Sequence, residues 1–99
     1  MPARVIKFQD FQKNALLKVF NDVKTSPHTP TIAGMTHEVD CLEQDINKGH
    51  RIRGEQYWVT NAEFDTLCSV LAIAEWLGES TLYYERRTVR HMLEMANQL

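Results

Sequence analysis

Residues 60–78 read TNAEFDTLCSVLAIAEWLG, and this stretch decides the fold. Thr60 is followed three residues later by Glu63, which is the capping-box pattern. In that pattern each side chain accepts a hydrogen bond from the backbone N–H of the other residue. Gly78 then stands where a helix commonly ends, because glycine adopts the left-handed conformation without strain. The pattern predicts a helix at 61–77.

The apolar residues of this stretch recur every three or four positions, as they do on one face of a helix. Val59 and Phe64 also occupy the positions of a hydrophobic staple, a contact that fixes the start of a helix. The predicted inner face comprises Phe64, Leu67, Cys68, Leu71, Ala74 and Leu77.

A second helix is predicted after Gly78, at 81–97. Ser80 or Thr81 supplies its N-terminal cap. Its predicted inner face comprises Leu82, Val89, Met92, Leu93 and Ala96. The best-specified part of the chain is therefore a pair of helices joined at a glycine.

An earlier helix is predicted at 10–24. Asp10 fits an N-cap, and an apolar stripe follows it. The stripe comprises Phe11, Leu16, Leu17, Phe20 and Val23. Pro27 and Pro30 then mark a linker, since neither can continue a helix.

A further helix is predicted at 36–48, with Gly49 as its C-terminal cap. Its apolar seam is narrow and comprises Met35, Val39, Leu42 and Ile46, at spacings of 4, 3 and 4. A seam this thin indicates a helix that lies on the surface of the core or pairs with another chain.

The predicted fold class is mainly α, a small single domain over 1–99 built as a bundle of about four helices. Val5, Ile6 and Phe8 fit either a short strand or an apolar lead-in. Tyr57 and Trp58 have strand chemistry, and their surroundings fit either a short hairpin or an extended connector. A short strand or hairpin near 4–8 and 51–59 therefore stays open.

Composition bounds the class of protein. The chain has 99 residues and is 43% hydrophobic, which fits one globular core and excludes a disordered chain. Its longest apolar run, 70–74, is far shorter than the roughly 20 residues that cross a bilayer. We therefore expect no membrane partner, and we expect a cytoplasmic location. In that compartment Cys41 and Cys68 are expected to be buried thiols rather than a disulfide.

The net charge is distributed unevenly along the chain. The net charge is +3 for residues 1–35, −6 for 36–79 and +1 for 80–99. The acidic middle segment argues against a protein that coats nucleic acid, because phosphate would be repelled there.

His37 and Cys41 stand four residues apart on one helix, a usable spacing for two metal ligands. A structural zinc site needs four ligands, and this pair occurs often by chance. The ordinary interpretation is an exposed histidine beside a half-buried thiol, and we expect no metal. Nor does the sequence place a nucleophile beside a base, so we expect no enzyme and no cofactor.

The C-terminal helix carries a band of positive charge and several aromatic rings. Two consecutive tyrosines cannot both face inward on a helix, and exposed aromatics near arginine anchor protein interfaces. The predicted partner-binding residues are Trp76, Tyr83, Tyr84, Arg86, Arg87 and Arg90. Alternatively, the arginines form a solvated face, with Arg90 paired to Glu94.

The helix–glycine–helix arrangement resembles the helix-turn-helix of DNA-binding proteins. Ala74, Leu77 and Ser80 match that motif around Gly78, whereas Glu79 and Arg87 stand where it usually has apolar residues. The resemblance implies a DNA-binding transcriptional regulator. However, its leading residues at 82–85 would have to reach base edges, and the arginines come a turn later.

The favoured hypothesis is a small non-catalytic protein-binding or regulatory module that acts through protein–protein contacts as a homodimer. The narrow seam at 36–48, the surplus aromatics, and the separate acidic and basic segments motivate it, since opposite charges can complement each other across a twofold axis. The alternative is the helix-turn-helix-like DNA-binding regulator.

Overall fold

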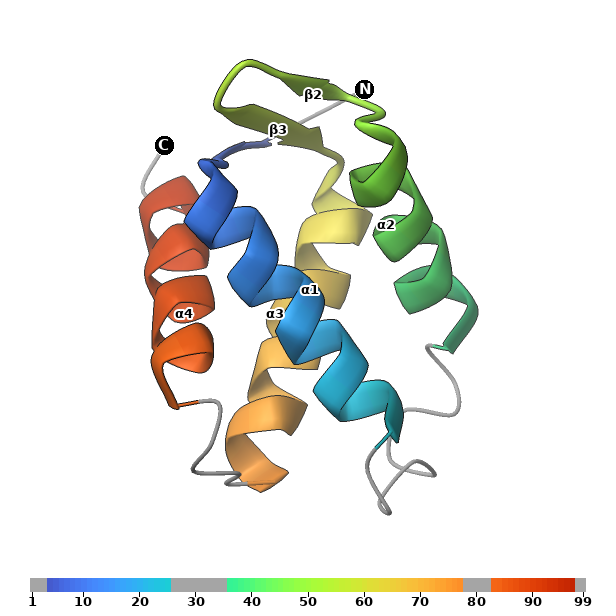
Figure 1. The fold of residues 1–99 in the computed structure, drawn as a ribbon, viewed down its shortest axis with the longest axis vertical. Coiled ribbons are helices and arrows are strands. Elements are labelled where there is room, and N and C mark those ends of the chain that lie inside the picture. The colour runs from blue at the N-terminus through green and yellow to red at the C-terminus, as the bar shows by residue number, and fades with distance from the viewer. Residues whose placement is uncertain (1–3, 26–35, 78–82, 98–99) are drawn as a thin grey trace.

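The computed structural model describes residues 4–25, 36–77 and 83–97, in which four helices lie below a small sheet (Figure 1). The helices are α1 (Asp10–Thr25), α2 (Thr36–Lys48), α3 (Asn61–Leu77) and α4 (Tyr83–Asn97). The strands are β1 (Arg4–Lys7), β2 (Ile52–Arg53) and β3 (Gln56–Val59). The predicted mainly α class is confirmed. Every predicted helix is present, with bounds within two residues of those expected.

The sheet is antiparallel in the order β1-β3-β2, so β3 is its central strand. Ile6 of β1 lies opposite Tyr57, and Ile52 of β2 lies on the other side of the same residue. The two open alternatives are thereby resolved in favour of a strand at 4–7 and a hairpin at 52–59. Phe8 follows the strand, and its backbone N–H donates to Glu55 O at 2.7 Å.

The β2–β3 hairpin turns through the two residues Gly54 and Glu55. Gly54 has a φ of 60°. A glycine with positive φ at the first central position suits a two-residue hairpin turn, because its twist matches that of the flanking strands.

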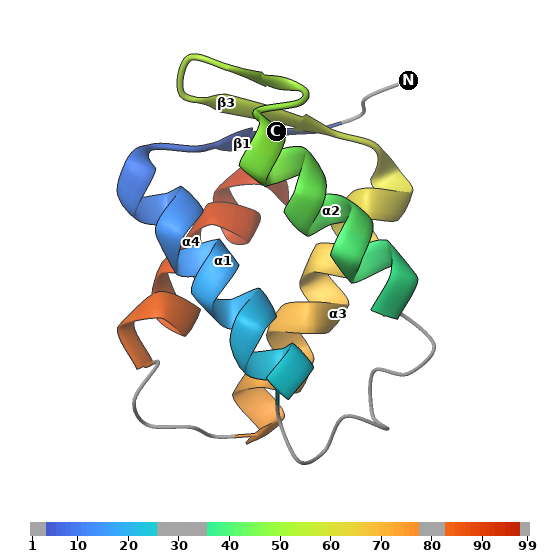
Figure 2. The ribbon, with the colours of Figure 1, turned by 45° about the vertical axis from the view of Figure 1, so that its right-hand side comes forward.

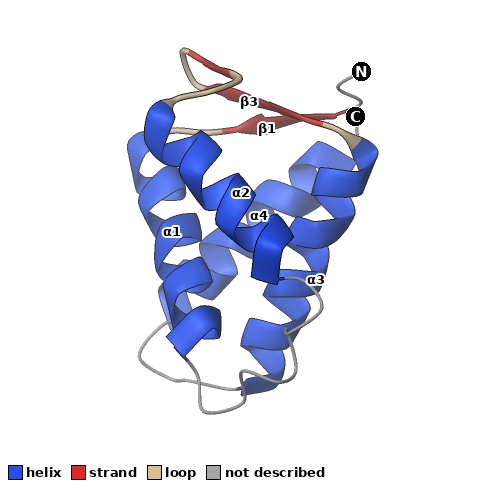
Figure 3. Ribbon diagram, turned by 90° about the vertical axis from the view of Figure 1, so that its right-hand side faces the viewer, coloured by secondary structure: helices blue, strands red, loops and turns tan. Residues whose placement is uncertain are grey.

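One face of the sheet closes one end of the helix bundle (Figure 3). Ile6, Tyr57 and Val59 point into the core and are each fully buried. Trp58, which alternates with them, is only half-buried on the opposite face. This alternation is the usual pattern of an antiparallel sheet that has one face on the core.

In Figure 1, helix α1 crosses in front of α3, with α4 on one side of it and α2 on the other, and the turned view of Figure 2 shows α4 behind α1. Helix α1 packs against all three. Its buried residues are Ala15, Leu16, Val19, Phe20 and Val23. Gln9 occupies the cap position, where its N–H donates to Gln12 Oε1 at 2.8 Å. The expected N-cap, Asp10, is instead the first residue of the helix.

Phe11 was expected on the inner face of α1 and is instead 58% exposed. It is nine residues from Phe20, and at about 100° per residue the two side chains point in opposite directions. Phe20 is fully buried, so Phe11 faces solvent.

The predicted cap of α3 is confirmed in both directions. Thr60 N donates to Glu63 Oε1 at 2.8 Å, and Glu63 N donates to Thr60 Oγ1 at 3.1 Å. Val59 and Phe64 of the staple are both buried. Two backbone donors that the helix cannot satisfy internally are thereby paired.

The predicted C-terminal cap of α2 is also confirmed. Gly49 has a φ of 72°. Its N–H donates to Ile46 O at 3.1 Å, and His50 N donates to Asp45 O at 2.8 Å. These two bonds form a Schellman motif, which satisfies carbonyls at the end of the helix.

The seam of α2 packs into this chain's own core. Val39, Leu42 and Ile46 are at most 3% exposed, and α2 contacts α1 and α3. The helix therefore lies on the surface of the core, and its seam is not available to another chain.

Several sequence predictions fall on residues outside the described part of the chain. They concern the linker prolines Pro27 and Pro30, the seam residue Met35, the turn at Gly78, and the second cap and first apolar residue (Ser80, Thr81 and Leu82). Among the described helices, none has both the length and the hydropathy of a membrane span.

Tyr57 carries a buried hydroxyl that has no hydrogen-bond partner in the described part of the chain. Its ring packs on Phe8, with centroids 5.0 Å apart. Burial raises the pKa of this hydroxyl, and the nearby Glu63 carboxylate raises it further, so it stays neutral.

We expect Tyr57→Phe to stabilise the protein by about 1 kcal/mol, because an unpaired buried hydroxyl costs about 1–3 kcal/mol and the ring contact is kept. Thermal unfolding should show a midpoint about 4–8 °C higher. A loss of more than about 1 kcal/mol would mean that the hydroxyl is hydrogen-bonded in solution.

Candidate functional site

The solvent side of α4 carries exposed and half-buried residues at helical spacing, which we call the α4 face. It comprises Tyr84, Arg87, Thr88, His91 and Met95. Tyr84 is 79% exposed and Met95 53%. The opposite side of α4 packs into the core through Val89, Met92, Leu93 and Ala96. One helix therefore combines a conventional inner face with an outer face that is partly apolar.

A groove of about 380 Å³ lies beside the α4 face, where α4 meets α1. It is lined by Phe11, Gln12, Tyr84, Arg87, Thr88 and His91. Phe11 lies outside the core and adds an exposed aromatic ring to the same surface. The groove thus combines aromatic rings with one arginine, the residue types that most often anchor protein interfaces.

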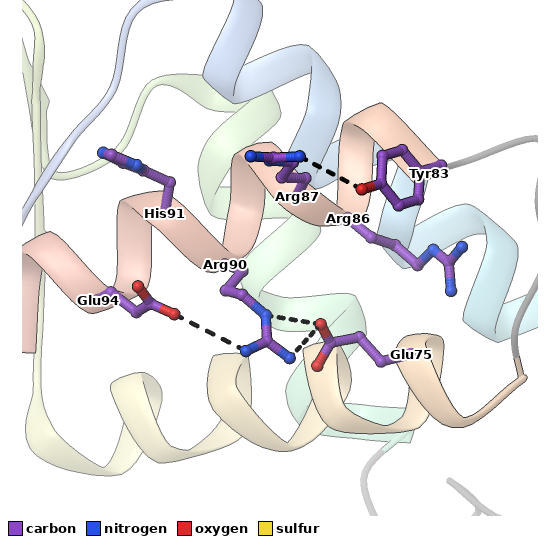
Figure 4. A pocket seen from close by; sticks show the side chains of 7 residues that line it. All are labelled: Glu75, Tyr83, Arg86, Arg87, Arg90, His91 and Glu94. Atoms are coloured by element: carbon purple, nitrogen blue, oxygen red, sulfur yellow. Dashed lines mark hydrogen bonds and ion pairs between the residues drawn. The ribbon is translucent and has the colours of Figure 1, made fainter.

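A second groove, of about 610 Å³, lies on the other flank of α4, between α4 and α3 (Figure 4). It is lined by Glu75, Tyr83, Arg86, Arg87, Arg90, His91 and Glu94. It brings together four of the predicted site residues, namely Tyr83 and the three arginines. Two carboxylates within the same groove make it a poor site for an anion.

Two of the three arginines brace α4 against α3. Arg90 Nε donates to Glu75 Oε2 at 2.8 Å, and Arg90 also lies 3.8 Å from Glu94 (Figure 4). The hydrogen bond to Glu75 raises the pKa of the Arg90 guanidinium further. Arg86 Nη1 donates to Ala74 O at 3.4 Å. That carbonyl lies in the last turn of α3, where carbonyls lack partners in the helix.

Arg87 differs from the other two arginines. It is exposed, and within the described residues its polar contact is to Tyr83, whose hydroxyl accepts from Arg87 Nη1 at 3.3 Å (Figure 4). No carboxylate in the described ranges pairs with it. Arg87 is therefore the arginine of the band whose charge is available to a partner.

The predicted aromatic residues Trp76, Tyr83 and Tyr84 are all exposed. Tyr83 and Tyr84 are in edge-to-face contact, with ring centroids 5.7 Å apart. Trp76 is 68% exposed on α3, and it lines neither groove beside α4. Trp76 therefore lies outside the two grooves that contain the other predicted site residues.

The acidic residues of α2 are largely engaged within the chain. Lys24 lies 3.1 Å from Asp40 and 2.7 Å from Glu43, and these contacts raise the pKa of the Lys24 ammonium. Asp45 lies 2.9 Å from Arg51. Because internal cations already neutralise these carboxylates, α2 offers little free negative charge to the basic band of another copy.

His37 and Cys41 are neighbours, with Nε2 and Sγ 3.6 Å apart. Cys41 is exposed, so the expectation of a buried thiol is wrong there. The reason is its position on the side of α2 that faces away from the seam. Among the residues that the structure describes, no three histidine, cysteine, aspartate or glutamate side chains are grouped to hold a metal ion.

Cys68 is only half-buried, and neither cysteine is in a disulfide. Burial raises the pKa of the Cys68 thiol. The charge of Asp65 raises this pKa further, while that of Arg4 lowers it. A raised pKa disfavours the thiolate, which is the nucleophilic form. The arrangement does not favour covalent chemistry at this thiol.

Sequence reasoning missed Phe11 and Met95 as exposed residues of the candidate site. The signal for Phe11 was available, since it lies five residues before Leu16 and so breaks the spacing of three or four. Met95 lies outside the predicted inner face of its helix, so its exposure follows from the same spacing.

The chain was compared with protein-family models, with curated proteins and with solved structures, and none of the three comparisons gives a match. The candidate site therefore rests on its own geometry.

Proposed function

We propose that this protein is a small non-catalytic protein-binding and regulatory module that acts through protein–protein contacts as a homodimer, with the α4 face as its binding surface. The narrow seam of α2 and its acidic residues no longer support this proposal, because both are used inside the chain. The support for the proposal comes instead from the exposed residues on the surface of α4.

One observation carries the proposal. Of the large apolar and aromatic side chains that the structure records as exposed, four lie on α4 or in the groove beside it, namely Phe11, Tyr83, Tyr84 and Met95. Single exposed apolar residues are ordinary, but a group of them on one surface is typical of an interaction site. Arg87 adds an available charge, and arginine is enriched in interface centres.

The two free cysteines, Cys41 and Cys68, support a place in the reducing cytoplasm, where thiols persist. The grooves beside α4 support binding rather than catalysis. Neither is a closed pocket around a nucleophile and a base, which acid–base or covalent chemistry would require.

Light scattering after size exclusion tests the homodimer. At micromolar concentration we expect a mass near twice the 11.5 kDa of one chain. Tyr84→Ala combined with Met95→Ala should shift the protein to a single-chain mass, because both side chains are removed from the surface. Folding should be kept, since exposed substitutions usually change stability by less than about 0.5 kcal/mol.

The matched control is Gln44→Ala, an exposed substitution on α2, which should leave the dimer intact. A wild-type mass near one chain would overturn the homodimer. A single-chain mass together with a salt-sensitive shift of duplex DNA, lost on replacing Arg86, Arg87 and Arg90 by alanine, would support the DNA-binding regulator instead.

A further inference from the structure

We propose that the two copies pair through their α4 helices, which lie antiparallel across a twofold axis. This inference rests on the proposed homodimer and specifies its geometry. It follows from two properties of the α4 face, namely the spacing of its residues and the placement of its charges.

The spacing of the α4 face suits a second helix. Tyr84, Thr88, His91 and Met95 follow one another at intervals of 4, 3 and 4 residues. This repeat keeps one stripe of a helix in contact with a neighbouring helix over its whole length. The stripe spans about 16 Å at 1.5 Å per residue, which is three turns of contact.

A twofold axis makes the face complementary to itself. In an antiparallel pair, residues equally far from the middle of the stripe lie opposite each other. Tyr84 then meets Met95 of the second copy, and Thr88 meets His91. The largest ring thus packs against a flexible thioether, a favourable contact at the edge of an aromatic ring. Phe11, which lines the same groove as Tyr84 and His91, extends this apolar surface.

The placement of charged residues favours an antiparallel over a parallel arrangement of the two α4 helices. Arg87 and Glu94 lie seven residues apart, so they project from the same flank of α4, two turns from each other. In an antiparallel pair, this flank meets its own copy in reverse, and each Arg87 faces Glu94 of the second copy. In a parallel pair about a twofold axis, this flank would instead meet the opposite flank of the second copy, which carries Glu85 and the buried Met92, so Arg87 would not face Glu94.

Both side chains of this proposed pair are accessible. Glu94 is 62% exposed at its side chain, and its contact within the chain is the 3.8 Å approach to Arg90. Arg90 already holds Glu75 at a shorter distance. Arg87 is held by a neutral hydroxyl. Each charge can therefore turn toward the second copy without breaking a close ion pair.

A charge exchange tests the geometry. Arg87→Glu alone and Glu94→Arg alone should each raise the dimer dissociation constant by about tenfold or more, because each creates two like-charge contacts across the axis. The double variant Arg87→Glu/Glu94→Arg should return it to near the wild-type value. An equimolar mixture of the two single variants should also form dimers. Sedimentation equilibrium measures the dissociation constant for both single variants, for the double variant and for the mixture.

The double variant also controls for folding, since it carries both substitutions and should still dimerise. If the wild type dimerises but the single variants do so equally well, this geometry is wrong while the homodimer stands. If the single variants dissociate and the double variant does not recover, the pairing of Arg87 with Glu94 is wrong. A monomeric wild type would overturn the proposed function itself.

Discussion

Ile46→Ala is expected to lower the free energy of unfolding by about 2–5 kcal/mol, the usual cost of truncating a fully buried isoleucine to alanine. Ile46 is completely buried at the contact of α2 with the rest of the core. Domains of this kind are stable by only about 5–15 kcal/mol, so the loss is a large share of the total. Urea unfolding should show a lower midpoint with an unchanged slope.

The control for Ile46→Ala is Gln44→Ala, two residues away on the exposed side of the same helix. It should change stability by less than about 0.5 kcal/mol. Both should be measured at one protein concentration, since self-association shifts apparent stability. An Ile46→Ala variant as stable as the wild type would show that the seam of α2 does not pack into this core.

The seam of α2 also illustrates what the sequence can and cannot predict. Its spacing predicts a helix with one apolar side, and Gly49 predicts where the helix ends. The spacing does not say what covers that side, because a thin stripe fits both a core and a second chain. That choice depends on the volume left between α1 and α3, which no local pattern encodes.

The strands were harder to predict than the helices for a related reason. A capping box joins residues three apart, such as Thr60 and Glu63, so both partners are visible in one short stretch. The strand pair joins Ile6 to Tyr57, about fifty residues away in the chain. Each segment alone is equally compatible with an extended connector.

In the candidate site, the exposure of side chains was predictable from the sequence, whereas ion pairs between different helices were not. Consecutive tyrosines on a helix cannot both be buried, and Tyr83 and Tyr84 are both exposed. The ion pair of Arg90 with Glu94, at 3.8 Å, was predictable from their spacing of four residues. The closer bond to Glu75 was not, because Glu75 lies on a different helix. The available charge of the band therefore reduces to Arg87, which sequence alone does not distinguish from its neighbours.

Glu63→Ala is expected to destabilise the protein by about 2–4 kcal/mol, because one carboxylate serves both the α3 cap and an ion pair. Arg51 donates to both oxygens of Glu63, with a distance of 2.6 Å from Nη1 to Oε1, and also to Asp45 at 2.9 Å. Arg51 is itself held at a φ of 62°, a conformation unusual for a residue with a side chain. The network joins the end of α2 to the start of α3.

Glu63→Gln separates the two roles of this carboxylate. Glutamine also serves at this position of a capping box, so the bond from the Thr60 backbone N–H is kept while the charge opposite Arg51 is lost. We expect Glu63→Gln to lower the free energy of unfolding by about half as much as Glu63→Ala does. The control is Glu38→Gln on the exposed side of α2, which should change stability by less than about 0.5 kcal/mol.

The pH dependence of the Glu63→Gln variant has a definite sign. Burial alone would raise the pKa of Glu63, but the hydrogen bonds from Arg51 and the Thr60 backbone outweigh it, so the pKa is lowered in the folded protein. The carboxylate therefore adds its full stability above its unfolded pKa of about 4.3, and that stability is lost as the pH falls through the folded value. The advantage of the wild type over Glu63→Gln should be constant from about pH 7 to about pH 5 and should shrink in more acidic solution. An advantage that persists unchanged at about pH 2 would mean that the charge of Glu63 is not what stabilises this junction.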